Sequence, residues 1–151
     1  MNESIFLQVG VKIFLKKEDG KYLLLKRSSV RYPNIKNFWD IPGGRIFPGT
    51  PLFENIRREV FEETKLQVLV EPRLISAQDI IRLPEKHIVR LTFLGEISGS
   101  PEQLLSGKIC SGEPILNEEH TEYKWLTLAE MLHVKELDEF TREVIEKNLV
   151  T

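Results

Sequence analysis

The stretch that decides the fold is Gly43–Leu66, which reads GGRIFPGTPLFENIRREVFEETKL. Thr50 is a preferred helix N-cap and Pro51 suits the first helical position, so the sequence predicts a helix from Pro51 to about Thr64. One stripe of this helix is apolar and should face a core. It consists of Leu52, Ile56 and Val60, with Phe53 beside them.

A second stripe of the same helix is acidic. Glu59, Glu62 and Glu63 lie at i, i+3 and i+4, where like charges cost roughly 0.2–0.5 kcal/mol per pair. A divalent cation would turn that repulsion into a binding site, because hard Mg²⁺ takes carboxylate oxygens together with substrate phosphates. The alternative is a solvated acidic face, which is the usual role of a charge cluster.

The residues in front of the helix favour the cation site. Trp39–Gly44, WDIPGG, is a short apolar segment that ends in a Pro-Gly-Gly turn. Glycine lets the backbone approach a ligand closely, so this turn can place N–H or C=O groups beside the acidic helix.

At this point the chain resembles the Nudix hydrolase family, whose box reads G-x5-E-x7-R-E-U-x-E-E-x-G-U, with U an aliphatic residue. Gly44 opens the box, and REVFEETKL at residues 58–66 closes it with the spacing kept throughout. The resemblance implies an α/β/α sandwich with a mixed sheet and a Mg²⁺-dependent hydrolase, with Mn²⁺ as a substitute ion. It also implies a small-molecule nucleotide substrate and suggests a homodimer.

Two box positions depart from the family pattern. Thr50 stands where the early Glu belongs, and Lys65 stands where the late Gly belongs. In the family the early Glu supports the box Arg, and Glu54, one turn before Arg58, could take that task through an i, i+4 pair. Lys65 should lose a favoured left-handed cap at the helix end and so alter the local geometry.

The totals fit one domain over residues 1–151. The net charge is −2, which excludes a general nucleic-acid binder because such a protein needs a large basic surface. No apolar run reaches the roughly 18 residues of a membrane span, so no membrane partner is expected. The single cysteine, Cys110, excludes an internal disulfide and fits a reducing compartment. We therefore expect a cytoplasmic enzyme.

The expected order of elements is strands, helix, strands, helix, which predicts an α+β fold or a mixed-sheet sandwich with helices outside. Val9, Val11, Ile13 and Leu15 alternate along the first strand. The expected strands are Leu7–Lys16, Tyr22–Arg27, Phe38–Ile41, Leu74–Asp79, His87–Ile97 and Tyr123–Leu126. A capping box at Thr127–Glu130 should begin a short helix, and a C-terminal amphipathic helix should cover Leu137–Ile145.

Cations precede the acidic helix. Arg27 and Arg45 are predicted to bind substrate phosphates, because guanidinium groups bind phosphate oxygens in pairs. Arg31 and Lys36 are interpreted as ordinary surface charge.

A second site stretch, EEHTEYKW at residues 118–125, precedes the last strand. Several Nudix hydrolases are similar here, and in them this loop delivers a metal ligand or a general base. The resemblance makes Glu119 a ligand, so the full predicted metal set is Gly43, Glu59, Glu62, Glu63 and Glu119. The catalytic set is Glu63, Arg58 and His120, with Glu63 or a carboxylate of the loop acting on the attacking water.

Three functions remain open. Cleavage of the diphosphate linkage in a nucleotide sugar or nucleoside triphosphate ranks first, because the box keeps all its late acids. The second is glycosyl cleavage with His120 as base, since the layout also resembles the GDP-mannose mannosyl hydrolase branch, whose box lacks acids corresponding to Glu59 and Glu62. The third is a non-catalytic nucleotide-binding module, which Thr50 and Lys65 keep open. The long loop Ser98–Asn117 is assigned to substrate recognition or a subunit contact.

Overall fold

The structure, a computed structural model, describes residues 4–68, 70–97 and 113–149. Most of the long loop predicted at 98–117, including Cys110, therefore lies outside the described residues. The elements in chain order are β1 Phe6–Lys16, β2 Tyr22–Arg27, β3 Trp39–Asp40, β4 Gly43–Arg45, α1 Leu52–Thr64, β5 Arg73–Leu83, β6 Lys86–Glu96, β7 His120–Leu126, α3 Leu128–Leu132, α4 Glu139–Val144 and a π-helical turn at Ile145–Leu149.

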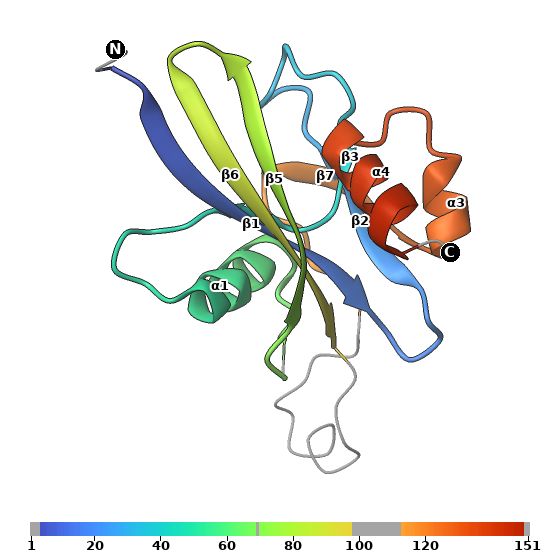
Figure 1. The fold of residues 1–151 in the computed structure, drawn as a ribbon. Helices are drawn as coiled ribbons and strands as arrows, with labels where there is room; N and C mark the ends of the chain where they lie inside the picture. Colours follow the sequence, from blue (N-terminus) through green and yellow to red (C-terminus); the bar gives the residue numbers. More distant parts are fainter. Residues whose placement is uncertain (1–3, 69, 98–112, 150–151) are drawn as a thin grey trace.

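The strands form one mixed sheet (Figure 1). Their order is β3-β2-β1-β6-β5, with β4 also paired to β1 and β7 also paired to β2. β1 runs parallel to β6 along its whole length and antiparallel to β4, where Lys12 lies opposite Gly43. The glycine turn is thereby fixed against the centre of the sheet.

Each face of the sheet packs against helices, so the predicted α/β/α sandwich is confirmed. Alternate residues of β1 and β2 point to opposite faces. On one face Val11, Ile13, Leu15, Leu23 and Leu25 pack with Ile56 and Val60 of α1. On the other face Phe14 and Leu24 pack with Met131 of α3 and Val144 of α4. Figure 1 shows α1 on one side of the central strands and α3 and α4 on the other.

The predicted strands are present, and two of them have an end that differs by more than one residue from the prediction. β5 continues to Leu83 rather than ending at Asp79, because it forms a long antiparallel hairpin with β6. β7 begins at His120 rather than Tyr123, because His120 already pairs with Arg27 of β2. His120 is therefore the first residue of a sheet strand and not part of the preceding loop.

The start of α1 differs from the prediction. The helix begins at Leu52, and Pro51 is its N-cap without a side-chain hydrogen bond, so the assignment of Thr50 as N-cap was wrong. Asn55 organises this end instead. Its Nδ2 donates to the carbonyls of Thr50 and Pro51 at 2.8 and 2.9 Å, and its Oδ1 accepts the N–H of Phe47 at 3.0 Å.

The end of α1 also corrects an expectation. Lys65 adopts the left-handed conformation, with φ 63° and ψ 7°, and its N–H donates to the Phe61 carbonyl. The cap that a lysine was expected to lose is therefore kept. Thr64 and Leu66 are buried on either side and hold the backbone in this turn.

Among the helices that the structure describes, none combines the length and apolar content needed to cross a bilayer.

Candidate active site

A pocket of about 480 Å³ lies between α1, the glycine turn and the start of β7. The predicted site residues that line it are Arg27, Gly43, Arg45, Glu59, Glu62, Glu63, Glu119 and His120. Arg58, the remaining predicted residue, does not line the pocket; it contacts Glu59 and Glu62, which do. The pocket thus brings together predicted site residues from four separate stretches of the sequence.

The glycine turn is joined directly to the acidic helix. The Gly43 N–H donates to Oε1 of Glu63 at 2.8 Å. Gly43 has φ +142°, and a Cβ added there would lie 2.0 Å from the Val11 carbonyl oxygen, so no larger residue fits. Glu63 is only 4% exposed, and its Oε2 lies 3.6 Å from Nε2 of His120.

The acids and the histidine form a donor set that fits a divalent cation. Glu63, Glu119 and His120 offer ligand atoms that all lie within 4.8 Å of one another. Carboxylate oxygens are the ligands that Mg²⁺ and Mn²⁺ prefer, and imidazole also binds transition metals. Glu59 and Glu62 line the same pocket, but their carboxylates contact Arg58, at 3.0 and 3.3 Å.

Glycine at the next position makes room for one of these acids. A Cβ added to Gly44 would lie 2.7 Å from the Glu59 carboxyl carbon. This close approach keeps the Glu59 carboxylate against the turn backbone and within the pocket. Gly43 is therefore required by close contacts with backbone, whereas a larger residue at Gly44 would displace the Glu59 side chain.

Arg58 braces the acidic helix from behind. Its guanidinium donates to the Arg45 carbonyl at 3.1 Å and to Oδ1 of Asn55 at 3.2 Å, besides its contacts with the two acids. The group also lies 3.7 Å from the centroid of the Phe47 ring. The predicted pairing with Glu54 was wrong, because Glu54 is exposed whereas Asn55 is buried beneath the guanidinium.

Burial perturbs the titration of the two central groups. It raises the pKa of Glu63 to about 8, against the opposing influence of Lys12 and the Gly43 N–H. Burial, together with the positive charges of Lys12 and Arg27, lowers the pKa of His120 to about 4. Without a bound cation, Glu63 is mostly protonated and His120 neutral at pH near 7, so their contact is not an ion pair.

A buried cluster centred on Asp40 forms the cationic wall of the pocket. Asp40 contacts Arg27 at 3.1 Å, Lys12 at 3.2 Å and Arg90 at 3.3 Å, and it accepts the Thr141 hydroxyl at 2.5 Å. Burial by itself would raise the pKa of the Asp40 carboxyl, but the cations of Arg90, Lys12 and Arg27 hold that pKa well below its usual range. Arg27 therefore reaches the pocket from a fixed position.

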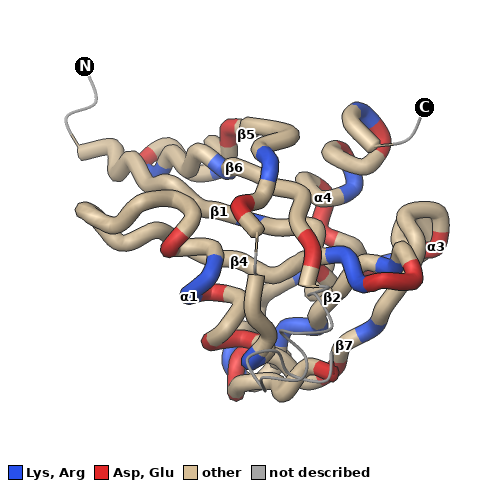
Figure 2. Tube along the Cα trace, turned by 90° about the horizontal axis from the view of Figure 1, so that it is seen from below, with Lys and Arg blue, Asp and Glu red and all other residues tan. Residues whose placement is uncertain are grey.

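Arg45 occupies the exposed rim of the pocket. Its Nη1 donates to the Gln8 side-chain oxygen at 2.5 Å. Along α1, Arg57 and Arg58 lie between Glu54 and Glu59, so that basic and acidic segments are adjacent on the helix (Figure 2).

Sequence reasoning missed Lys12, Asp40 and Arg90. One signal was available for Lys12: it shares a strand face with Phe14, which is fully buried. A lysine on a covered face needs an anionic partner. The sequence does not identify that partner, because Asp40 reaches Lys12 only through the packing of β3 beside β2.

Apolar side chains line another part of the pocket, beside the charged Arg82, Arg90 and Asp138. Ile80, Ile88 and Phe140 line it, and the Arg82 guanidinium lies 4.9 Å from the centroid of the Phe140 ring. Tyr32 and Ile35 also line the pocket. The cavity therefore offers both a charged end and a surface suited to a flat organic group.

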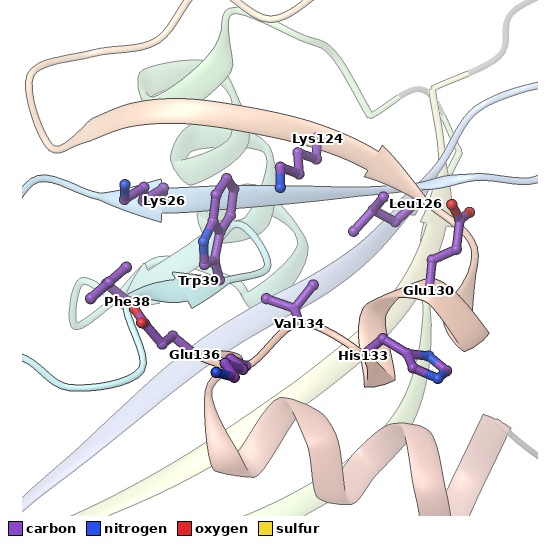
Figure 3. Close-up of a pocket in the computed structure, with 10 residues that line it drawn as sticks. Lys26, Phe38, Trp39, Lys124, Leu126, Glu130, His133, Val134 and Glu136 are labelled. Carbon is purple, nitrogen blue, oxygen red and sulfur yellow. The ribbon is translucent and has the colours of Figure 1, made fainter.

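A second pocket, of about 610 Å³, lies on the Trp39 side of β3 (Figure 3). Lys124 points toward Trp39, with its Nζ 5.0 Å from the ring centroid. The carboxylates that line it are Glu130, which caps α3, and Glu136. None of the box acids lines this pocket, so its larger volume does not make it the site of the box chemistry.

Comparison with known proteins agrees with the fold and the box. A family model described as NUDIX domain matches residues 6–147. Over 90 residues the chain is 31% identical to a protein of Bacillus subtilis (strain 168) that is named, provisionally, an 8-oxo-dGTP diphosphatase. This match covers 60% of the chain and 54% of that protein, so it spans about half of the relative's length.

Two solved structures resemble the whole chain. The MutT protein from Methanosarcina mazei Go1 is 27% identical with a TM-score of 0.73, and the match covers 97% of this chain and 94% of that one. The MutT NUDIX hydrolase from Burkholderia pseudomallei is 23% identical with a TM-score of 0.72, covering 96% and 99%. The match of the family model to almost the whole chain shows that this protein belongs to the NUDIX domain family.

Proposed function

We propose that the chain is a Mg²⁺-dependent hydrolase that cleaves the phosphoanhydride linkage of a nucleoside triphosphate or a nucleotide sugar. The observation that carries this proposal is the buried Glu63 carboxyl. It accepts the Gly43 N–H at 2.8 Å and lies in one donor cluster with Glu119 and His120. A bound cation would offset the burial that raises the pKa of this carboxyl and so favour its charged form.

We assign some of these residues to binding the cation and others to binding the substrate. Gly43, Glu59, Glu62, Glu63 and Glu119 would hold Mg²⁺ or Mn²⁺. When bound, the ion polarises phosphoryl oxygens and lowers the pKa of a coordinated water. Arg27 and Arg45 bind the phosphates at the wall and rim of the pocket. Arg58 keeps the acidic side chains of α1 in position without touching the substrate.

The general base is a carboxylate near the ligand cluster. Glu63 is one candidate and Glu119, in the loop before β7, is another. His120 is neutral across the physiological range because its pKa is lowered, which suits it to accept a hydrogen bond but makes it a weaker base than an ordinary histidine.

The apolar residues of the pocket support a nucleoside as the organic part of the substrate. Ile80, Ile88 and Phe140 provide a surface on which a base can pack, and the cationic wall provides the complement to a phosphate chain. The name of the Bacillus subtilis relative favours a nucleoside triphosphate, including an oxidised purine, over a nucleotide sugar.

A second candidate function is glycosyl cleavage of GDP-mannose with His120 as base. The observation in its favour is the 3.6 Å approach of His120 Nε2 to Glu63, which places the imidazole inside the pocket. It ranks lower, because the full set of box acids suits charge stabilisation at phosphorus. A third candidate is a nucleotide-binding module without catalysis.

A substrate panel in isotopically labelled water separates these candidates. The panel contains nucleoside triphosphates, 8-oxo-dGTP, ADP-ribose, GDP-mannose and dinucleoside polyphosphates, each with Mg²⁺. The proposal predicts that the label enters a phosphate product. Label in free mannose, with GDP released, would support glycosyl cleavage instead. No turnover of any substrate by wild type or Glu63→Gln would favour the binding module.

A further inference from the structure

Lys12 lies at the centre of β1, directly opposite Gly43 in the strand register. Its side chain is 12% exposed, and its Nζ has three acceptors within reach: Oδ2 of Asp40 at 3.2 Å, the Ile41 carbonyl at 3.2 Å and the Gly43 carbonyl at 3.5 Å. A lysine ammonium has three N–H donors and no acceptor. All three acceptors here belong to the segment that ends in the glycine turn.

Both ends of this connection are fixed. Asp40 is held in turn by Arg27, Arg90 and Thr141, so the anion that Lys12 contacts cannot move freely. Gly43 lies so close to the lysine that an added Cβ would be 2.8 Å from its Cα and 2.9 Å from its Cδ. The lysine stem therefore packs against the turn while its ammonium bonds to it.

We propose that Lys12 is a positioning residue for the cation site. By tying the carbonyls of Ile41 and Gly43 to Asp40, it sets the orientation of the Gly43 residue. The N–H of that residue holds Glu63, and its carbonyl is one of the proposed cation ligands. A carbonyl oxygen has two lone pairs, so Gly43 can accept from Lys12 and still face a cation. This inference rests on the proposed function.

A direct role in binding phosphate does not fit the contacts. The three donors of Lys12 are matched by three acceptors of the chain, and its side chain is more buried than that of Arg27, 12% against 23% exposed. Substrate affinity should therefore depend on Arg27 and be insensitive to Lys12.

The electrostatic alternative predicts an effect of opposite sign. An ammonium beside a cation site repels the cation, so if charge alone mattered, removing it would tighten ion binding. Loss of orientation would weaken binding instead, and outer groups that orient metal ligands typically contribute about 10–100-fold in affinity. The sign of the change therefore decides between the two.

The test is direct Mn²⁺ binding to the full chain, measured by electron paramagnetic resonance without substrate. Lys12→Met keeps the length of the stem and removes the ammonium; Lys12→Gln keeps one polar donor group without charge. We expect Lys12→Met to weaken Mn²⁺ binding by about tenfold or more and Lys12→Gln to weaken it less. The matched control is Lys16→Met on the same strand, whose lysine pairs with Glu96 away from the pocket; it should bind Mn²⁺ as wild type does.

Steady-state kinetics supply a second readout. At saturating Mg²⁺, Lys12→Met should keep the substrate KM of wild type. The variant should need a higher Mg²⁺ concentration for activity and should have a lower kcat. Arg27→Met should raise the substrate KM.

Wild-type or tighter Mn²⁺ binding by Lys12→Met would overturn the inference, as would failure of both Lys12 variants to fold, which would indicate a purely structural role. Absence of Mn²⁺ binding by wild type would overturn it as well. A wild type that binds Mn²⁺ but hydrolyses no nucleotide would remove the proposed function alone.

Discussion

The amide N–H of Gly43 donates a 2.8 Å hydrogen bond to Oε1 of Glu63, a residue 20 positions further along the chain. This bond joins the turn after β3 to the last turn of α1. It also fixes one oxygen of a carboxyl whose other oxygen lies 3.6 Å from His120. The backbone of the glycine turn and the Glu63 side chain of α1 thus set the geometry of the candidate cation site together.

Glu63 should make the stability of the ion-free protein depend on pH. Burial raises its pKa from the ordinary 4.5 to about 8 in the folded chain. Between these values the folded state binds more protons at Glu63 than the unfolded state does, so the contribution of Glu63 to stability falls as pH rises. The lowered pKa of His120 acts in the opposite direction below about 6.5, so the net fall in stability is expected from about pH 6.5 to 8. Urea unfolding in the presence of a chelator measures this slope.

The control for this slope is Glu63→Gln, whose side chain does not titrate. The variant should lose stability less steeply over the same pH range. Equal slopes for the two proteins would show that Glu63 is not the group responsible.

The kcat of the enzyme should fall even when Arg58 is replaced by another positively charged residue. Arg58→Lys loses the planar set of donors that reaches the Arg45 carbonyl, Asn55 and two acids of α1. We expect kcat to fall by about 10–100-fold, the usual effect of removing a group that orients metal ligands. Arg57→Lys, one position earlier and exposed, should keep wild-type kinetics. Equal losses in both variants would contradict the assigned role of Arg58.

Asp40 should be the most important single charge for stability. Asp40→Asn would leave Lys12, Arg27 and Arg90 without their shared carboxylate in a buried cluster. Breaking a buried ion pair in this way costs about 3–5 kcal/mol. Chemical denaturation measures the loss. A variant as stable as wild type would show that the cations find other partners.

Lys65 offers a gain in stability. A residue with a side chain pays about 1–2 kcal/mol in the left-handed conformation that Lys65 adopts at φ 63°. Lys65→Gly removes that cost but adds freedom to the unfolded chain, so we expect a net gain of up to about 1 kcal/mol in unfolding free energy. Lys65→Ala is the control and should give no gain. If glycine destabilised the protein, the contacts of the lysine side chain would outweigh the backbone cost.

The sequence was sufficient for features that repeat at fixed intervals. The four-residue spacing identified Ile56 and Val60 as the buried face of α1, although Leu52, the first residue of the predicted stripe, is exposed. The alternation from Val9 to Leu15 identified β1. The box spacing placed Glu63 beside the glycine turn. These patterns are local, since each follows from the period of one helix or strand.

Contacts between distant elements could not be predicted. Lys12 and Asp40 meet because β1 and β3 both pair with β2, and neither residue carries a spacing that indicates the other. Asn55 was missed for a related reason: Glu54 has the favourable charge and spacing toward Arg58, but the bend before α1 buries Asn55 and leaves Glu54 exposed. In both cases tertiary packing determined which residue forms the contact.

The central claim is that Glu63 belongs to a cation-dependent hydrolytic site. The most direct measurement is the rate at which Glu63→Gln hydrolyses the best nucleotide of the panel at saturating Mg²⁺, beside Glu54→Gln as an exposed control on the same helix. We predict a loss of at least about 100-fold for Glu63→Gln and the wild-type rate for Glu54→Gln. A Glu63→Gln variant that hydrolyses the nucleotide at the wild-type rate would contradict the account.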